Sequence, residues 1–312
     1  MIYICLLIAL FAAELGYFRI ADHFNIIDKP NERSSHSQIT LRGGGVIFYI
    51  GILLFFFVQG FQYPWFLIGL TLISIISFAD DIKPQSSKLR LLVHFTAMAL
   101  MFYEWGLFNF PWFYTLLALI FCTGILNAYN FMDGINGITG SYSLVVIGAL
   151  WYINNDVQFV DSNLIYILLL SLLVFNFYNF RTKAKCFAGD VGAITIAFII
   201  VFLLGQLIVK TGDFSYILLL VIYGVDSILT IIHRIILKEN IFEPHRKHVF
   251  QIMGNELKMP HLFVSLVYAF LQIIIVIGLL YFNSHAYLYS VIVILVLSIC
   301  YVIFKKKYFH LH

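Results

Sequence analysis

The chain has 312 residues, of which 62% are hydrophobic and only 11% are charged. An ordinary soluble domain carries about a quarter charged residues, so this composition excludes a soluble globular protein. The net charge of +3 is too small to indicate a nucleic-acid partner. Because an apolar run of about 20 residues crosses a bilayer, the sequence predicts one all-α polytopic membrane domain over residues 1–312.

Eleven apolar runs are long enough to be membrane helices. The first has no Lys or Arg before Arg19 and no small-residue cleavage pattern, which favours a retained helix over a cleaved signal peptide. The predicted spans are residues 2–21, 44–60, 64–79, 89–105, 112–129, 136–153, 164–180, 191–209, 214–237, 261–282 and 286–304.

The basic residues indicate an orientation for these spans. With eleven crossings, 18 of the 19 Lys and Arg residues fall in connections on one side, and only Lys210 falls on the other. The positive-inside rule makes the basic side cytoplasmic, so we expect the N-terminus outside and the C-terminus in the cytoplasm. Nearly all the acids, the paired histidines and the glycine-rich stretches share that side. We therefore expect the chemistry at the cytoplasmic face.

The first basic connection reads PNERSSHSQITLRGGG, residues 30–45, and contains Arg33 and His36. Its end, Arg42 followed by three glycines, opens the second predicted helix. Amides exposed at a helix N-terminus beside an arginine suit an anion. Glycines at a membrane helix end also allow close packing, and the sequence leaves both interpretations open.

The next connection begins with two adjacent carboxylates, Asp80 and Asp81, at the end of the third apolar run. They repel each other and meet the negative end of the helix dipole, so the arrangement favours a bound divalent cation. A solvated acidic loop is the alternative.

The string NAYNFMDGINGITG follows the fifth run. It places Asn127, Asn130, Asp133 and Asn136 three residues apart, which predicts one helix face of oxygen ligands of the kind that Mg²⁺ prefers. A polar kink is the alternative interpretation.

Two later strings complete the polar face. In FAGDVGA, Asp190 lies between glycines at a helix start, where it could also be a simple N-cap. His245, Arg246, Lys247 and His248 are consecutive and could clamp a pyrophosphate through Arg and cationic His, or attract anionic lipid. Together, carboxylates, amides and cations on one face complement a Mg²⁺-bound polyphosphate, and they predict phosphoryl transfer.

These strings resemble, in order, the motifs of the polyprenyl-phosphate N-acetylhexosamine-1-phosphate transferases, bacterial glycosyltransferase family 4. The match includes Lys88, seven residues after Asp81. The resemblance implies a multi-pass protein of the bacterial inner membrane that transfers a sugar 1-phosphate from a UDP-N-acetylhexosamine to undecaprenyl phosphate and releases UMP. It also implies a requirement for Mg²⁺, with Mn²⁺ as a substitute, and it is compatible with a homodimer.

The ending PHRKHVFQ is similar to the branch that initiates O-antigen or enterobacterial common antigen. That branch uses N-acetylglucosamine or 6-deoxy relatives such as N-acetylfucosamine and N-acetylquinovosamine. Peptidoglycan or teichoic-acid lipid synthesis is the alternative within the family. A membrane transporter is the alternative of a different class, and it is opposed because the polar residues gather at one interface rather than in mid-span.

The resemblance also implies roles for individual residues. Asp80 and Asp81 would position the metal and the lipid phosphate; a base role for one of them stays open, although a phosphate monoester with a second pKa of about 6 hardly needs a base. The remaining implied roles are Asp190 as a Mg²⁺ ligand with Asn130 or Asp133, Lys88 on phosphate, Phe187 stacked on uracil, Gly134 and Asn136 on the nucleobase, and His245, Arg246, His248 and Arg42 on the substrate's phosphates or sugar.

Overall fold

The computed structural model describes residues 2–30, 38–241, 243 and 245–308. Arg33 and His36 of the first basic connection lie outside the described residues. The helices of the first half are α1 (Ile2–His23), α2 (Val46–Gln59), α3 (Pro64–Ile82), α4 (Ser87–Glu104), η1 (Leu107–Asn109), α5 (Trp112–Met132) and α6 (Ile138–Val157). Those of the second half are α7 (Ser162–Asn179), α8 (Gly189–Thr211), η2 (Phe214–Leu220), α9 (Val221–Ile236), α10 (Val249–Gln251), η3 (Ile252–Glu256), α11 (His261–Tyr281), η4 (Asn283–His285) and α12 (Ala286–Tyr308).

The described helices confirm an all-α membrane protein. Eight helical segments are long and apolar enough to cross a bilayer: α1, α3, α5, α7, α8, η2 with α9, α11, and η4 with α12. Helix α2 is apolar but has only 14 residues. Each of the eleven predicted runs overlaps one helical segment, from α1 to α8 in order and then η2 with α9, α11 and α12. The count of eleven crossings and their orientation stay predictions.

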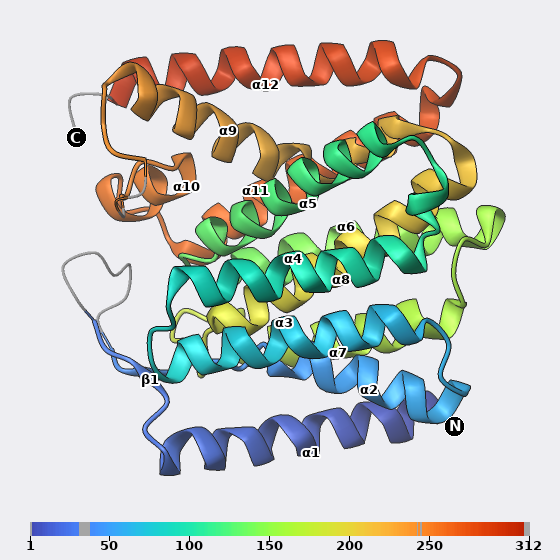
Figure 1. The fold of residues 1–312 in the computed structure, drawn as a ribbon. Coiled ribbons are helices and arrows are strands. Elements are labelled where there is room, and N and C mark those ends of the chain that lie inside the picture. Colours follow the sequence, from blue (N-terminus) through green and yellow to red (C-terminus); the bar gives the residue numbers. More distant parts are fainter. Residues whose placement is uncertain (1, 31–37, 242, 244, 309–312) are drawn as a thin grey trace.

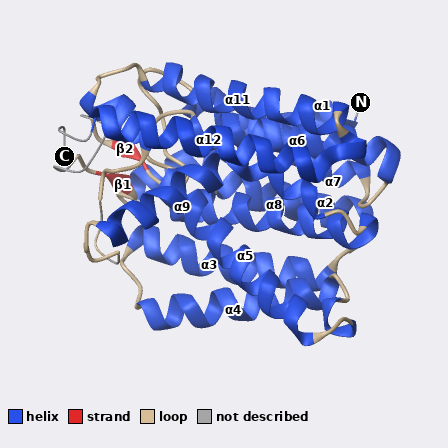
Figure 2. Ribbon diagram, turned by 90° about the horizontal axis from the view of Figure 1, so that it is seen from above, coloured by secondary structure: helices blue, strands red, loops and turns tan. Residues whose placement is uncertain are grey.

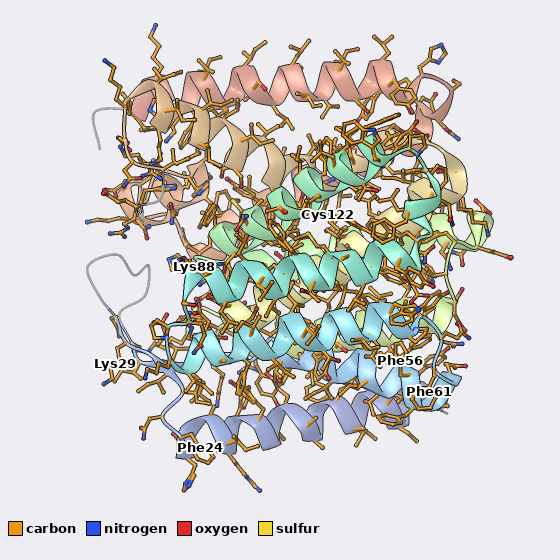
Figure 3. The ribbon with its side chains drawn as sticks, viewed as in Figure 1. Phe24, Lys29, Phe56, Phe61, Lys88 and Cys122 are labelled. Carbon is orange, nitrogen blue, oxygen red and sulfur yellow. The ribbon has the colours of Figure 1, made fainter. Side chains whose placement is uncertain are left out.

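The long helices run side by side, and their connections gather at two opposite ends (Figure 1). The N-terminus lies at one end, and the C-terminus lies at the other together with β1 (Ile27–Asp28), β2 (Thr40–Leu41) and α10 (Figures 1 and 2). Lys29 and Lys88 lie at this second end, whereas Phe61 lies at the first (Figure 3). We call the end with β1, β2 and α10 the polar end.

Helix α8 is the centre of the bundle. It is apolar around its whole circumference, as expected of a helix enclosed by others. In its most apolar stretch of 18 residues, 83% of the residues are buried. It packs against α2, α3, α5 and α6. Helix α12 is the least buried of the long helices: in the most apolar stretch of η4 with α12, only 6% of the residues are buried. The N-terminus of α8 therefore reaches the polar end from the most buried of the eight long helical segments.

The sequence did not predict the two short strands. They pair antiparallel, with Ile27 opposite Leu41 and Asp28 opposite Thr40. Leu41 also forms a parallel bridge with Cys186, just before α8. These pairings bring the connection after α1 against the start of α8, which places Arg42 beside Asp190.

Candidate functional site

A polar pocket of about 240 Å³ opens at the polar end. Its walls come from six separate parts of the chain, and seven of the predicted site residues line it. The lining residues are Asp28, Arg42, Asn130, Asp133, Gly134, Ile135, Asn136, Asn179, Phe187, Gly189, Asp190, Gln251 and His261. The structure therefore brings together most of the residues that the motifs predicted.

Asp81 lies behind this pocket and caps the start of α8. Its Oδ1 accepts a hydrogen bond from the amide of Asp190 at 2.8 Å, and its Oδ2 accepts one from the amide of Val191 at 3.0 Å. Its Oδ1 also forms an ion pair with Nε of Arg42 at 2.6 Å, and its side chain is fully buried. A carboxylate from α3 thus satisfies the N-terminal amides of α8 and holds Asp190 in place.

Asp80 is bound on the other side of the same helix end. Its Oδ2 pairs with Nη1 of Arg90 at 2.7 Å, and its Oδ1 accepts a hydrogen bond from the amide of Gln85 at 2.6 Å. Its carboxyl group also lies within hydrogen-bonding reach of Asp190. The cation that two adjacent carboxylates require is therefore supplied, in this structure, by two arginines.

Arg42 joins two of these carboxylates. Besides Asp81, its Nη2 binds Oδ1 of Asp190 at 3.2 Å. Burial alone would lower the pKa of the guanidinium, but the Asp81 and Asp190 carboxylates outweigh burial and raise it. Arg42 therefore keeps its positive charge and faces the polar pocket.

The three glycines after Arg42 serve close packing rather than anion binding. The amides of Gly44 and Gly45 donate to the carbonyl oxygens of Phe187 and Ala188, at 2.9 and 3.1 Å. A Cβ at Gly45 would lie 2.2 Å from the Cα of Gly192. The first turn of α2 is thus pressed against α8, and the prediction that these amides hold an anion is wrong for Gly44 and Gly45 because both amides are already bonded.

The end of α5 and the loop after it contribute three polar side chains to the pocket, but not as one helix face. Helix α5 ends at Met132, so Asp133 and Asn136 lie beyond it. Asn127 is exposed and donates to the carbonyl of Thr123 in its own helix. The predicted single face therefore breaks at the helix end, and the pocket receives Asn130, Asp133 and Asn136.

Asp133 has a distinct environment among these ligands. Burial raises its pKa to about 6, while a hydrogen bond from the Thr139 hydroxyl at 2.6 Å lowers it in part. Asn136 donates through Nδ2 to the carbonyls of Arg181 and Thr182 at 2.9 and 3.2 Å. Only the amide oxygen of Asn136 is left to accept a hydrogen bond from a ligand.

Sequence reasoning missed Asn179, at the end of α7. Its side chain is buried, its Oδ1 accepts from the amide of Gly137, and its Nδ2 donates to the carbonyl of Cys186, both at 2.8 Å. One carboxamide thus ties the Asp133 loop to the segment before Asp190. No local pattern marks this residue, because its two partners come from different loops.

Three further polar lining residues were not predicted as site residues: Asp28, Gln251 and His261. Gln251 ends the string PHRKHVFQ and Asp28 lies just before the first basic string, but nothing in the sequence distinguished them. Gly134 and Phe187 line the pocket as expected. The pocket side of Gly134 is limited by Phe250, whose ring would lie 2.9 Å from a Cβ there.

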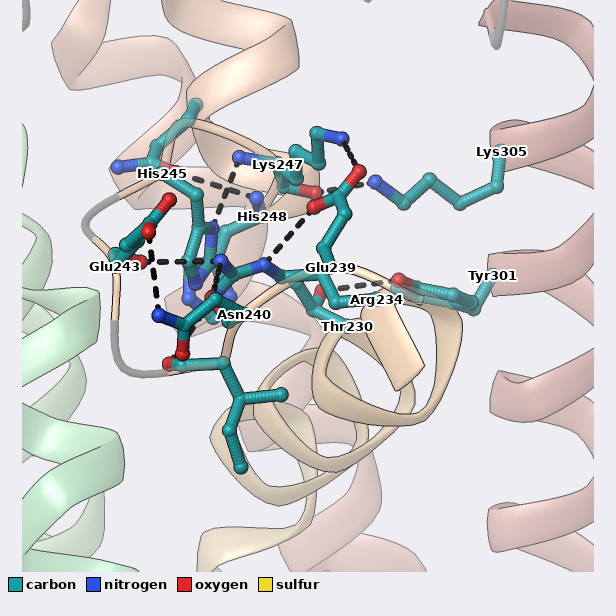
Figure 4. A network of polar contacts seen from close by, with 12 residues as sticks. Thr230, Arg234, Glu239, Asn240, Glu243, His245, Lys247, His248, Tyr301 and Lys305 are labelled. Carbon is teal, nitrogen blue, oxygen red and sulfur yellow. Dashed lines mark hydrogen bonds and ion pairs between the residues drawn. The ribbon is translucent and has the colours of Figure 1, made fainter. Parts of the chain in front are cut away.

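The basic cluster after α9 is largely used within the protein (Figure 4). His248 is buried, with its Nδ1 3.4 Å from Oδ1 of Asp226. Lys247 pairs with Glu239, which also binds Nε of Arg234 at 3.1 Å. His245, Arg246 and His248 do not line the polar pocket.

His245 does not contribute the positive charge that the sequence suggested. Burial, together with the neighbouring His248, Arg234, Lys305 and Lys247, lowers its pKa to about 3. Its imidazole is therefore neutral near pH 7. Lys88 is exposed at the start of α4, at the polar end, and does not line the polar pocket (Figure 3).

The residues of the pocket fit a magnesium ion that is bound mainly through substrate. Among the described residues, no group of three or more His, Cys, Asp or Glu could hold a metal by itself. Mg²⁺ commonly uses one or two carboxylates, with waters and substrate phosphates as the other ligands. Asp190, Asp133 and Asn130 offer that set, and the contact between the Asp80 and Asp190 carboxyls calls for a proton or a cation.

The fold and the pocket define an integral membrane protein with a polar binding site at one end of its helices. The sequence model of a family described as "Glycosyl transferase family 4" matches residues 63–208. This range includes α3 to α8 except the last turn of α8. Arg42 and the segment from His245 to His248 lie outside this match. The matched part contains Asp80, Asp81, Lys88, the Asn130–Asn136 loop, Phe187 and Asp190.

Named relatives agree with this match. The chain is 28% identical over 258 residues to a probable undecaprenyl-phosphate N-acetylglucosaminyl 1-phosphate transferase of Bacillus subtilis, which covers 74% of this chain and 70% of the relative. It is 24% identical to the undecaprenyl-phosphate alpha-N-acetylglucosaminyl 1-phosphate transferase of Escherichia coli K12, over 75% of this chain and 71% of the relative. It is also 24% identical to the transferase of the same name from Yersinia pestis, over 83% of this chain and 79% of the relative. These matches confirm the family resemblance that the motifs carried.

Proposed function

We propose that this chain transfers an N-acetylhexosamine 1-phosphate from its UDP-sugar to undecaprenyl phosphate. An oxygen of the lipid phosphate attacks the sugar-bearing phosphorus, the bond between the two phosphates of the donor breaks, and UMP leaves with the bridging oxygen. The relatives reported above are named as undecaprenyl-phosphate N-acetylglucosaminyl 1-phosphate transferases. The protein acts in the bacterial inner membrane with its polar end in the cytoplasm.

One observation carries the proposal. The polar pocket collects Arg42, Asn130, Asp133, Phe187 and Asp190 from three regions that are distant in sequence. A cation, hard oxygen ligands and an aromatic ring within one pocket suit a nucleoside diphosphate sugar with its metal. The helices around the pocket are those that would accept a polyprenyl chain from the bilayer.

The chain's own residues would hold the substrates rather than form bonds with them. Asp190, with Asn130 or Asp133, would hold Mg²⁺, which supplies positive charge against the charge developing on the donor phosphates. Phe187 offers its ring to the uracil; its backbone is fixed by hydrogen bonds to Leu41 at 2.8 Å and from Gly44 at 2.9 Å. Arg42 would bind phosphate oxygens.

The contacts of Asp80 and Asp81 favour direct attack by the lipid phosphate. Both oxygens of each carboxylate are already bonded to an arginine or a backbone amide. The lipid phosphate, with a second pKa of about 6, is largely dianionic near pH 7 and needs no base. The two aspartates therefore act by positioning Asp190 and the arginines.

The positions of two buried acidic residues, Glu14 and Asp226, oppose the interpretation of the protein as a transporter. Glu14 is buried beside Cys186, 3.7 Å from its Sγ, and Asp226 accepts hydrogen bonds from Tyr268 at 2.7 Å and from the amide of Val249 at 3.0 Å. Both face neighbouring helices near the polar end rather than an aqueous path. Acids that carry an ion would lie along such a path.

UMP release from purified protein in detergent tests the proposal. The reaction contains undecaprenyl phosphate, a panel of UDP-N-acetylhexosamines that includes 6-deoxy sugars, and Mg²⁺ or chelator. We expect UMP that depends on lipid and on Mg²⁺ with one donor, and loss of it in Asp190→Ala. A 6-deoxy donor would support an O-antigen role. Release of UDP, or of no nucleotide with any donor, would refute the proposal.

A further inference from the structure

We propose that Arg42 is an internal substitute for the metal ion: it neutralises Asp190 while the site is empty and gives up that carboxylate when the divalent cation arrives. The inference rests on the proposed metal site and adds a competition between a side chain and the ion. In this view Arg42 keeps its contact with Asp81 throughout. Its freed N–H groups then face the phosphates of the donor.

The two contacts of the guanidinium are unequal. Nε lies 2.6 Å from Asp81, whose side chain is fully buried, while Nη2 lies 3.2 Å from Asp190, whose side chain is 22% exposed. A guanidinium carries five donors in a fixed fork. Arg42 can therefore hold Asp81 through Nε and exchange the carboxylate at Nη2 for another oxygen.

The backbone of Arg42 is fixed, so the exchange involves the side chain alone. Its amide donates to the carbonyl of Ile26 at 3.0 Å, and its carbonyl accepts from the hydroxyl of Tyr17 at 2.5 Å. Tyr17 is buried on α1. Tyr17 of α1 and Ile26, just before β1, thus fix the backbone of Arg42, while Asp81 holds its guanidinium.

The charges around Asp190 favour such a substitute. Asp80, Asp81 and Asp190 surround one helix start, and Arg90 neutralises only Asp80 directly. Without Arg42, two carboxylates would face each other across the N-terminus of α8, and they would repel. A divalent ion at Asp190 brings its own charge, which repels the guanidinium and removes the reason for that contact.

Mn²⁺ binding to the full-length protein in detergent, without substrate, tests this competition. The free ion is measured by electron paramagnetic resonance, so the readout is independent of activity. In Arg42→Gln, which loses the charge, Mn²⁺ should bind about three- to tenfold more tightly than in the unchanged protein. Ordinary structural damage would weaken Mn²⁺ binding, so a gain is diagnostic.

Arg90→Gln is the matched control, because it removes a cation from the same cluster without touching Asp190. A smaller gain than in Arg42→Gln is expected; an equal or larger gain would show a general field effect and overturn the proposal. Arg42→Lys keeps a cation for Asp81 but cannot reach both carboxylates. It should fold and bind Mn²⁺ about two- to threefold more tightly.

The outcomes separate the two levels of inference. A folded Arg42→Lys protein with unchanged or weaker Mn²⁺ affinity would overturn the role of Arg42 and leave the metal site standing. If Asp190→Asn leaves the Mn²⁺ affinity of the protein unchanged, the proposed metal site itself fails.

Discussion

Replacing Asn179 with alanine tests how the two loops of the pocket are held together. The Asn179 carboxamide accepts from the amide of Gly137 and donates to the carbonyl of Cys186, both at 2.8 Å. The alanine variant leaves both backbone groups buried without this partner. Because the first loop carries Asp133 and the second leads to Asp190, the substitution should loosen the spacing between two candidate metal ligands.

The size of the effect follows from the two orphaned groups. Each buried polar group left without its partner costs about 1–3 kcal/mol. We therefore expect Asn179→Ala to lower the free energy of unfolding by about 2–5 kcal/mol. Asn179→Asp keeps the acceptor for Gly137 but sets a carboxylate against the Cys186 carbonyl, so it should be destabilising although it has nearly the same shape.

Unfolding in detergent micelles, followed by circular dichroism, measures this effect. Asn176→Ala is the matched control: it lies one turn earlier on α7, and its Nδ2 donates at 2.9 Å to Leu172 of the same helix. The control should lose about 1 kcal/mol or less. If Asn179→Ala is no less stable than Asn176→Ala, the carboxamide does not hold the loops, and the explanation of the pocket's assembly is wrong.

Three further predictions concern packing and pH. Gly45→Ala places a methyl group 2.2 Å from the Cα of Gly192 and should cost about 1–3 kcal/mol of stability, whereas Gly16→Ala, with open space around it, should not destabilise in the same unfolding assay. The pKa of His245 is lowered to about 3 by burial, and an unfolded histidine titrates near 6.5. Stability should therefore fall as the pH drops from 6.5 towards 4, and less so in His245→Asn, when unfolding midpoints are compared. Asp226→Ala removes the acceptor that joins α9 to α10 and α11 and should cost about 2–5 kcal/mol in the same assay.

The membrane helices were predictable because their signal is local. A run of about 20 apolar residues forms a helix in lipid, because a helix satisfies the hydrogen bonds of every backbone group within the segment. The pairing of Ile27 with Leu41, and of Leu41 with Cys186, has no such local signal. It joins residues up to 145 positions apart and depends on how α1, α2 and α8 pack.

The same division holds within the site. Asp133 was found because it is spaced regularly among amides after an apolar run, and Asp190 because it stands in order with the other polar strings of the same side. Asn179 was missed because its importance lies in contacts with Gly137 and Cys186, which the sequence does not place together. His248 was found as a polar residue but given a role in substrate binding, while the structure buries it beside Asp226. A motif marks where polar groups concentrate, and tertiary packing decides which of them reach the pocket.

Asp80 and Asp81 show how a physical argument can identify a site from the sequence while the residues that complete it come from distant parts of the chain. The sequence implied that two carboxylates at a helix end need a positive charge, and the structure provides it through Arg90 and Arg42. Neither arginine is adjacent to the pair in sequence, and Arg42 is separated from it by α2 and most of α3. Because Arg42 also contacts Asp190 at the pocket wall, the guanidinium that stabilises the helix end also faces the polar pocket. Under the proposed function, the stability of the helix end and the recognition of the substrate would therefore be coupled through this one group.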